Sequence, residues 1–278
     1  MIRFLSLSSG SCGNCYLLTD GESGIVIDAG VSMRRLKKTL AEHGLTLDCF
    51  QAILVTHDHL DHIRHLGAWC KHLQKPVYAT PTLHDALAVH TFTRDWISPC
   101  RRVLGEGRTV IHLRPGLEEA LCPVVHPFVV PHDATQTVGY YIEWEGIHFF
   151  LMTDAGRVTE EAVEYASMAE SVVIESNYDT GMLFGGPYPH ELKMRICKGN
   201  GHLSNDECAS AVKRIWHPGL RNIFLCHLSE NNNTPERAFE ASAEVLRSID
   251  AGNGYSAKQV TNLQTLPRSR PSQVYNLQ

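Results

Sequence analysis

Short apolar runs separated by polar turns dominate the first part of the chain. Five of these runs predict strands, at residues 3–7, 15–19, 24–28, 52–56 and 76–79. The run over 52–56 is almost wholly apolar and β-branched, which is typical of a strand buried on both faces. Ser32 is placed to cap a helix in which Leu36 and Leu40 lie four positions apart. Two further helices are expected, from about 60 to 73 and from about 81 to 90.

The second half of the chain repeats this pattern. Strands are predicted at residues 121–130, 137–144, 147–152, 171–175, 222–226, 260–266 and 273–277. Helices are predicted at residues 159–166, 189–197 and 205–216 and from Thr234 onwards. Residues 91–108 are expected to be irregular. Because no low-complexity linker or change of composition interrupts the chain, we predict a single domain, residues 1–278, in two similar β-plus-α halves.

Composition narrows the class of protein. Apolar residues make up 43% and charged residues 20% of the 278 positions, as in a globular protein with a substantial core. No apolar run approaches the roughly 18 residues of a membrane span, and the start of the chain lacks the apolar stretch of a signal peptide. Nine cysteines, an odd number, favour reduced thiols and a cytoplasmic location. The net charge of −5 argues against a polybasic coat for nucleic acid, but not against a local phosphate site.

The 16 histidines are the main chemical signal. Four metal-ligating side chains follow the predicted buried strand directly, in the pattern His57-x-His59-x-Asp61-His62. Alternate residues of an extended segment project to the same side, so His57 and His59 can reach one ion. Asp61 and His62 fall at the start of the next helix and can serve a second ion. This spacing suits two metals about 3.5–4 Å apart.

Three further candidate ligands follow apolar strands elsewhere in the chain: His132, Asp154 and His227. A strand end is where a rigid scaffold presents a side chain to a cleft. Asp154 is suited to bridge two ions, and a bridging hydroxide with a pKa near neutrality is the expected nucleophile. The nitrogen and oxygen donors suit Zn²⁺, Mn²⁺ or Fe²⁺ alike, so the metal stays open.

The motifs, in the order in which they occur along the chain, resemble those of the metallo-β-lactamase superfamily. The matching segments are Asp28-Ala29-Gly30, Thr56-His57-Asp58-His59-Leu60-Asp61-His62, His132, Thr153-Asp154-Ala155-Gly156 and Cys226-His227-Leu228-Ser229. The resemblance implies a fold of the mixed α/β (α+β) class. The fold that the resemblance implies is a four-layer αββα sandwich, with a dinuclear site at the edge where the two sheets meet.

A closer resemblance is to the YycJ/WalJ branch of that superfamily. It rests on Ser9-Gly10-Ser11-Cys12-Gly13-Asn14, Glu175-Ser176-Asn177-Tyr178-Asp179, Met182-Leu183, Tyr188-Pro189, Leu192-Lys193-Met194-Arg195-Ile196 and Gly201-His202-Leu203-Ser204-Asn205. The sequence departs from the branch at Tyr178, where a histidine is expected; a tyrosine hydroxyl can still donate a hydrogen bond. The resemblance implies a metal-dependent 5′-to-3′ exonuclease whose partner is DNA, through its 5′ ends, or another phosphodiester.

His202 is the predicted general acid, because related phosphodiesterases use such a histidine near the leaving group. Cleaving a phosphodiester at neutral pH needs a proton for the departing alkoxide, and imidazole is well tuned to supply it. Asp61 is the second residue assigned to catalysis. Phosphate-binding candidates come from a Gly/Ser-rich loop, the Glu175-Ser176-Asn177-Tyr178-Asp179 motif, a basic helix and a helix start whose amides can hold an anion. They are Ser11, Asn14, Asn177, Tyr178, Arg195, Ser204 and Asn205.

Other functions remain open on the same residues. The second candidate is a thioester or lactam hydrolase, such as a glyoxalase II-like enzyme. The third is a mononuclear iron persulfide oxygenase, in which Asp61 and His62 serve no second ion. A non-catalytic, metal-stabilised binding module is the fourth. Asp154 and His227 lie only 73 positions apart, which leaves no room for the large inserted domain of some RNA-processing relatives. The oligomeric state and the choice between DNA and RNA are open.

Overall fold

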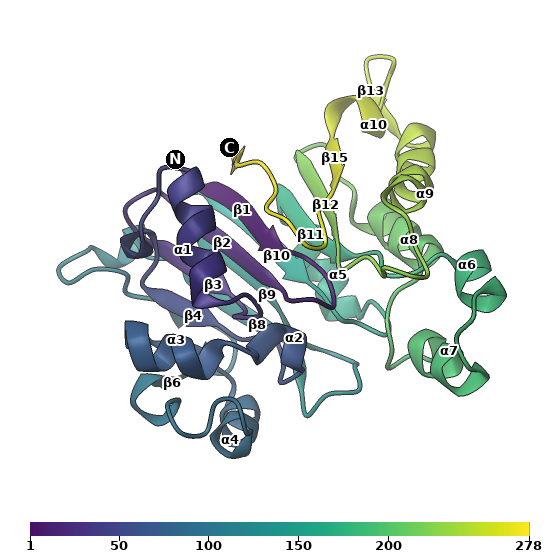
Figure 1. The fold of residues 1–278 in the computed structure, drawn as a ribbon. Coiled ribbons are helices and arrows are strands. Elements are labelled where there is room, and N and C mark those ends of the chain that lie inside the picture. The colour runs from purple at the N-terminus through teal and green to yellow at the C-terminus, as the bar shows by residue number, and fades with distance from the viewer. Residues whose placement is uncertain (278) are drawn as a thin grey trace.

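Two seven-stranded sheets lie at the centre of the molecule (Figure 1). The computed structural model describes residues 1–277. The first sheet has the strand order β16-β1-β2-β3-β4-β5-β6, and the second has the order β15-β12-β11-β10-β9-β8-β7. A separate two-stranded hairpin is formed by β13 (Asp250–Gly252) and β14 (Tyr255–Ser256).

The strands and helices have the following bounds. The first sheet contains β1 (Arg3–Ser8), β2 (Cys15–Thr19), β3 (Gly24–Ile27), β4 (Ala52–Leu54), β5 (Val77–Ala79), β6 (Arg101–Val103) and β16 (Tyr275–Asn276). The second contains β7 (Thr109–Val110), β8 (Val124–Val130), β9 (Thr137–Trp144), β10 (Ile147–Met152), β11 (Ser171–Glu175), β12 (Asn222–Cys226) and β15 (Asn262–Thr265). The helices are α1 (Met33–Glu42), α2 (Leu60–Ile63), α3 (Leu66–Leu73), α4 (Pro81–Val89), α5 (Glu160–Ala166), α6 (Thr180–Gly185), α7 (His190–Cys197), α8 (Asn205–Ile215), α9 (Pro235–Ser248) and α10 (Ala257–Val260).

The two sheets repeat one topology. In the first, β1, β2 and β3 are antiparallel, and β3 to β6 are parallel. In the second, β7 to β10 are antiparallel, and β10, β11, β12 and β15 are parallel. Parallel strands end at the same edge of a sheet, so the carboxyl ends of β3 and β4 lie together, as do those of β10, β11 and β12. This edge of each sheet is where ligand-binding loops of open α/β sheets lie.

Alternation along β10 shows how the layers form. Phe149 and Leu151 belong to the core between the two sheets, where the Phe149 ring lies 5.3 Å from that of Phe4 in β1. Phe150 and Met152 point to the opposite face and pack with buried residues of α5, α8 and α9. Helices α1, α3 and α4 cover the outer face of the first sheet (Figure 1). The expected four-layer αββα sandwich is therefore confirmed.

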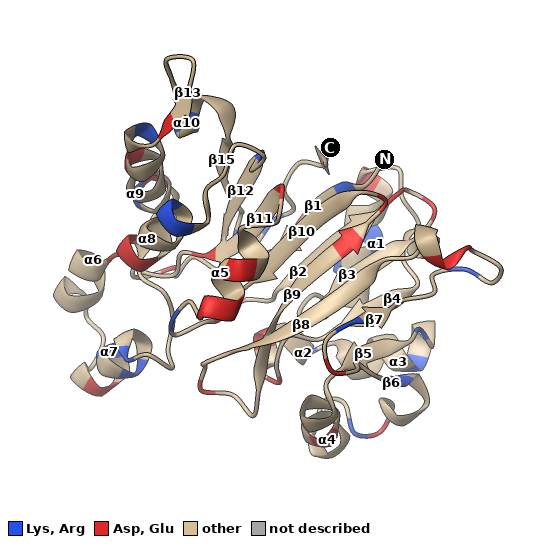
Figure 2. Ribbon diagram, turned by 180° about the vertical axis from the view of Figure 1, so that it is seen from behind, with Lys and Arg blue, Asp and Glu red and all other residues tan. Residues whose placement is uncertain are grey.

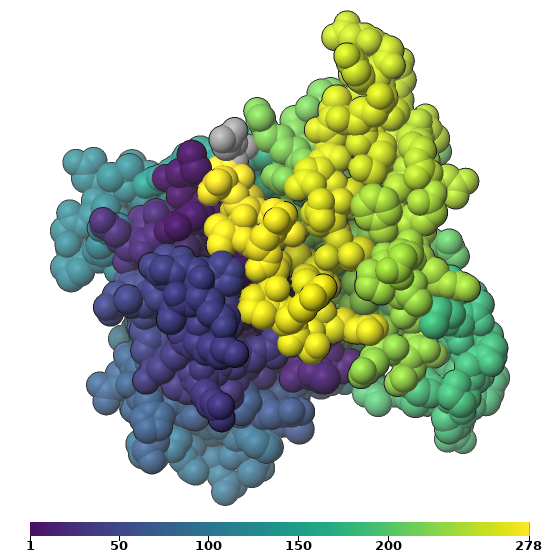
Figure 3. All heavy atoms as spheres, turned by 45° about the horizontal axis from the view of Figure 1, so that its top comes forward, coloured from purple at the N-terminus to yellow at the C-terminus, as the bar shows by residue number. Residues whose placement is uncertain are grey.

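The C-terminal segment ties the second sheet back to the first. After β15 the chain crosses to β1, where β16 pairs in antiparallel register with Phe4 opposite Tyr275. On the way, the carbonyl oxygen of Arg268 accepts a hydrogen bond from the Ser8 hydroxyl at 2.7 Å and one from the Ser9 amide at 3.2 Å. In Figure 3 this yellow segment lies against the purple and blue N-terminal part. It thereby holds the start of the loop over residues 9–14.

Charged residues lie mostly outside the sheets. In Figure 2 Lys and Arg are interspersed with Asp and Glu over the outer helices and loops, while the strands are largely uncharged. This distribution agrees with the absence of a polybasic pattern in the sequence. In the described part of the chain, no helix combines the length and apolar character needed to cross a membrane.

Most predicted elements are present, with several differences. The helix expected over 60–73 is divided into α2 and α3, because the chain changes direction at Arg64 and His65. Residues 91–108, expected to be irregular, contain β6, an edge strand whose three residues are all exposed, so that no apolar alternation indicates it. The apolar pattern does not predict α6, in which only Leu183 is buried, or the short elements β7, α10 and the β13–β14 hairpin. Val260, expected to begin a strand, ends α10 instead.

Candidate metal centre

The candidate site lies where strand ends of both sheets meet. Asp28 follows β3, Asp154 follows β10 and His227 follows β12, and all three have left-handed backbones, with φ of 62°, 53° and 52°. Residues other than glycine rarely adopt this conformation, although Asp and His tolerate it better than most. It costs on the order of 1–3 kcal/mol per residue and concentrates at functional sites. Here it turns three polar side chains back toward one point between the sheets.

A first group of histidines comes from β4's carboxyl end and the loop after β8. His57, His59 and His132 place one ring nitrogen each within 4.8 Å of one another. The ring centroids of His57 and His59 are 4.8 Å apart, and Nε2 of His132 lies 3.3 Å from Nδ1 of His59. As expected for alternate residues of an extended segment, His57 and His59 point to the same side.

A second group comes from α2 and β12. Asp61, His62 and His227 also place ligand atoms within 4.8 Å of one another. Asp154 lies between the two groups: its Oδ2 is 3.2 Å from Nε2 of His62, and its Oδ1 is 3.8 Å from Nε2 of His132. The structure thus brings all seven sequence-predicted ligand candidates together, in two groups joined by one carboxylate.

Hydrogen-bond acceptors on the side away from the site fix the ring orientations of two of these histidines. Nδ1 of His62 lies 2.7 Å from Oδ2 of Asp28, which also accepts from the Thr56 hydroxyl. Nδ1 of His132 lies 2.7 Å from the carbonyl oxygen of Gly201. When Nδ1 donates in this way, the lone pair of Nε2 is left to face the site. Ligating histidines in metalloproteins are held by such outer partners.

The donor set fits divalent cations. His57 is fully buried, its Nδ1 lies 3.0 Å from the Thr56 hydroxyl, and its Nε2 has no hydrogen-bond partner among residues 1–277. A buried nitrogen without a partner is costly unless something binds it. Asp154 adds a buried carboxylate beside it. Imidazole and carboxylate together suit Zn²⁺, Mn²⁺ or Fe²⁺.

The carboxylates of the site also raise the pKa values of two of its histidines, His227 and His62. Burial disfavours a charged His227, but the carboxylate of Asp154 and hydrogen bonds to Asp61 and Glu175 outweigh burial and raise its pKa to about 10. Burial likewise opposes a charged His62, yet Asp154, Asp28 and Asp61 raise its pKa well above the usual range. The carboxylates therefore create a strong demand for positive charge, which protons meet when no cation is bound.

Glu175, at the end of β11, connects the metal-ligand groups to His202. Its Oε1 lies 2.7 Å from Nδ1 of His202 and 3.0 Å from Nδ1 of His227, while its Oε2 accepts from the amides of Ala155 and Leu203. Burial opposes a charged His202, but Glu175 outweighs it and raises the pKa of the imidazole. Glu175 is not among the site residues predicted from the sequence, although a charged residue at the end of a buried apolar run is a signal that the sequence contains.

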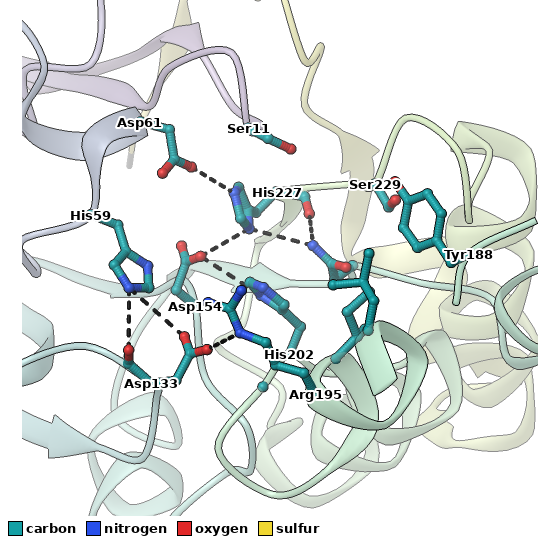
Figure 4. Close-up of a pocket in the computed structure, with 14 residues that line it drawn as sticks. Ser11, His59, Asp61, Asp133, Asp154, Tyr188, Arg195, His202, His227 and Ser229 are labelled. Atoms are coloured by element: carbon teal, nitrogen blue, oxygen red, sulfur yellow. Dashed lines mark hydrogen bonds and ion pairs between the residues drawn. The ribbon is translucent and has the colours of Figure 1, made fainter. Parts of the chain in front are cut away.

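A cavity of about 270 Å³ opens beside these groups (Figure 4). Its lining includes the predicted ligands His59, Asp61, Asp154 and His227, the predicted acid His202, and the phosphate candidates Ser11, Asn177 and Arg195. It also includes Asp133, which the sequence did not single out, and five residues of the matching motifs that were given no role: Tyr188, Leu192, Ile196, Gly201 and Ser229. Asp133 accepts a hydrogen bond from Nε of Arg195 at 2.5 Å at the edge of the cavity.

The other four phosphate candidates do not line the cavity and lie behind the residues that do. Asn14 is buried, with its Nδ2 2.8 Å from Nε2 of His62 and 3.1 Å from Oδ2 of Asp61. The Ser204 hydroxyl caps α8, and Tyr178 forms a β-bridge with Ser204. Asn205 is buried and bonded to the Ser176 hydroxyl and to Asn233. These contacts make the four residues part of the scaffold under the cavity.

The fold and this arrangement of histidines and aspartates define a class of protein: the chain belongs to the metallo-β-lactamase superfamily. Residues 24–228 match the family model described as "Beta-lactamase superfamily domain". The chain is a metal-dependent hydrolase of this superfamily, with donor groups compatible with divalent metal ions.

Within the superfamily the chain falls in the YycJ/WalJ branch. It is 30% identical over 256 residues to exodeoxyribonuclease WalJ of Streptococcus pneumoniae serotype 2 (strain D39), which covers 92% of each chain. It is 30% identical over 258 residues to exodeoxyribonuclease YycJ of Bacillus anthracis, covering 91% of this chain and 92% of the relative. The fold is similar to Zn²⁺-bound PqqB from Methylobacterium extorquens, with a TM-score of 0.67 and 16% identity over 98% of this chain and 99% of that one.

Proposed function

We propose that the protein is a dinuclear-metal phosphodiesterase that removes nucleotides from the 5′ end of DNA. The names of the relatives WalJ and YycJ support a DNA substrate. The observation that carries the proposal is the pair of hydrogen bonds that the Glu175 carboxylate accepts from His202 and His227, because it couples a candidate proton donor to a candidate metal ligand. This arrangement suits an ester whose leaving group needs a proton.

His57, His59 and His132 would hold one ion, and Asp61, His62 and His227 the other, with Asp154 contacting both. Divalent ions supply Lewis-acid contacts to phosphate oxygens and lower the pKa of a coordinated water. The two groups favour a dinuclear site over a mononuclear oxygenase, because Asp61 converges with His62 and His227. Zn²⁺, Mn²⁺ and Fe²⁺ remain the candidate ions.

His202 donates the proton in this proposal. Water loses a proton to solvent and its oxygen forms a bond to phosphorus, the bond from phosphorus to the 3′ oxygen of the terminal nucleotide breaks, and the imidazolium of His202 protonates that oxygen. Glu175 fixes the ring through Nδ1 at 2.7 Å, so that Nε2 carries the transferable proton. Arg195, Ser11 and Asn177 line the cavity and are the residues that would contact phosphate.

The size of the cavity supports removal of single nucleotides. Its volume of about 270 Å³ lies near the lower end of small-molecule sites, which run from roughly 300 to 1,000 Å³. A cavity of this size is matched better to one terminal nucleotide than to a longer stretch of duplex.

The test is release of mononucleotides from 5′-phosphorylated, end-labelled double-stranded DNA, with protein loaded separately with Mn²⁺ and Zn²⁺. We expect release by wild type, loss of release in Asp61→Ala, and a rate lowered roughly 100-fold or more in His202→Ala. The control variant is His72→Ala, which removes an exposed histidine of α3. Metal content is measured for every variant.

Each alternative function predicts a different result in such assays. Turnover of a glutathione thioester but not of DNA would replace the proposal with a glyoxalase II-like hydrolase. One iron per chain with oxidation of a persulfide would point to an oxygenase instead. Full activity of His202→Ala on DNA would leave the metal-dependent nuclease standing but remove the acid role of His202.

A further inference from the structure

Helix α7 presents two of its apolar side chains to the cavity instead of to a core. Within residues 1–277 it contributes no buried side chain, although a short helix usually depends on packing an apolar face. Leu192 and Ile196 lie four positions apart and both line the cavity, together with Tyr188 just before the helix. We call Tyr188, Leu192 and Ile196 the apolar wall.

Hydrogen bonds hold the apolar wall in place relative to His202. Nδ2 of Asn231 donates to the Tyr188 hydroxyl at 2.9 Å, and Nζ of Lys193 donates to the carbonyl oxygen of Gly186 at 2.7 Å. The amide of His202 donates to the carbonyl oxygen of Ile196 at 2.8 Å. Because His202 is bonded to the helix end that carries Ile196, the proton donor and the wall keep a fixed spacing.

The rest of the cavity is lined mainly by charged and polar side chains. Asp61, Asp154 and His227 line it across from α7, and Figure 4 shows Tyr188 on the far side of the cavity from Asp61. Arg195, next to Ile196, binds Asp133 through Nε, and within residues 1–277 neither of its Nη groups has a hydrogen-bond partner. A ligand that fits both sides has a phosphate for the metal-ligand side and Arg195, and a flat apolar ring for the wall. A nucleotide has both.

The position of His202 decides which nucleotide of the substrate meets the wall. The acid must lie beside the leaving oxygen, and in removal from a 5′ end the leaving oxygen belongs to the terminal nucleotide. That nucleotide therefore lies on the side of His202, which is the side of α7. Resting on the proposed function, we propose that the apolar wall is the binding site for the base of the 5′-terminal nucleotide.

Stacking on ring faces and aliphatic side chains does not distinguish one base from another. The apolar wall is therefore expected to add affinity for a terminal nucleotide with any base, and to add no affinity for an abasic terminal residue. The test compares two 5′-phosphorylated DNA duplexes that differ only at the terminal residue: one has thymidine and the other an abasic tetrahydrofuran. For wild type we expect the abasic terminus to raise KM roughly 5- to 100-fold, the range of base stacking on an aromatic side chain.

Removing the wall should abolish this preference. In the double variant Tyr188→Ala/Leu192→Ala, KM for the normal duplex should rise to that for the abasic duplex, and the difference between the two substrates should vanish. Tyr188→Phe keeps the ring and should retain the preference. Met194→Ala changes an apolar residue of α7 outside the cavity lining and should behave as wild type. Circular dichroism and metal content show that each variant is folded and loaded.

Equal KM values for the two duplexes in wild type would overturn the proposal. So would a loss in the double variant that is the same on both duplexes, because that result indicates a structural role alone. If no DNA is cleaved, the proposed function has failed, and release of the nucleoside from thymidine 3′-(methyl phosphate) is compared with release from its abasic tetrahydrofuran counterpart. Preference for the nucleoside ester, lost in the double variant, would still support the base site; no preference would overturn both proposals.

Discussion

Asp28 is outside the cavity lining, yet its carboxylate orients His62. Both side chains are fully buried, and Oδ1 of Asp28 also accepts the amide of Thr56 at 2.8 Å. Asp28→Asn keeps the shape of the side chain but replaces a carboxylate with an amide that can present its NH₂ to Nδ1. The preferred tautomer of His62 is then lost, and we expect metal affinity to fall roughly 10- to 100-fold. Competition with a chelating dye measures this affinity.

Asp85→Asn, at an exposed position of α4, is the matched control and should bind metal as wild type does. Unchanged affinity in Asp28→Asn would show that His62 keeps its orientation without the carboxylate, or that it is not a ligand.

The sequence motif around Ser204 fits two roles, helix capping and phosphate binding, and a substitution can distinguish them. Its hydroxyl accepts the amide of Glu207 at 3.1 Å, and Glu207 accepts the amide of Ser204 at 2.8 Å, which is a capping box at the start of α8. We expect Ser204→Ala to lower the free energy of unfolding by about 1 kcal/mol, measured by urea denaturation, and to leave KM for DNA unchanged. Ser210→Ala, exposed within α8, should not destabilise the protein.

The opposite pattern, a raised KM at unchanged stability, would restore the phosphate-binding role that the sequence predicted for Ser204.

At the scale of elements, the loop over residues 9–14 and helix α2 meet at Gly30. The amide of Asn14 donates to the carbonyl oxygen of Asp61 at 2.7 Å, and the amide of Gly30 donates to the carbonyl oxygen of Asn14 at 2.9 Å. A Cβ on Gly30 would lie 1.9 Å from the Asp61 oxygen and 2.4 Å from the Asn14 nitrogen. Both contacts are with backbone, so the loop or α2 has to move.

Gly30→Ala should therefore displace Asp61 from its partners. We expect a lower metal content per chain, measured by mass spectrometry, and nuclease activity reduced roughly 100-fold, as for misplacement of a reacting group by about 1 Å. Gly185→Ala is the control, since a Cβ there meets open space at the end of α6. Normal metal content in Gly30→Ala would mean that Asp61 does not hold an ion.

How much the sequence predicts depends on how local each contact is. His57, His59, Asp61 and His62 are adjacent in the chain, so a strand followed by a helix is enough to place them. The role of Glu175 depends instead on the close approach of β11, β12 and the Gly201 turn, which no local pattern contains. The apolar wall was missed for the same reason: the periodicity of α7 indicates a helix, but not that its apolar face meets a cavity.

For the whole molecule, bound metal would link the two sheets, because His57 and Asp61 come from the first half and His132, Asp154 and His227 from the second. A ligand at 100 times its Kd stabilises the folded state by about 2.7 kcal/mol per site, so two independent sites give about 5 kcal/mol. At roughly 2–4 °C per kcal/mol, chelation should lower Tm by roughly 10–20 °C, measured by calorimetry, and added Zn²⁺ or Mn²⁺ should restore it.

This measurement also tests the single-domain prediction. Because one core contains side chains from both sheets, among them Phe4, Phe149 and Phe224, we expect one cooperative transition with or without metal. Asp61→Ala should show a smaller fall on chelation, since one group of ligands is incomplete, whereas Asp85→Asn should match wild type. Two separate transitions would show that the halves unfold independently. An unchanged Tm after chelation would contradict metal binding between the sheets, and with it the proposed mechanism.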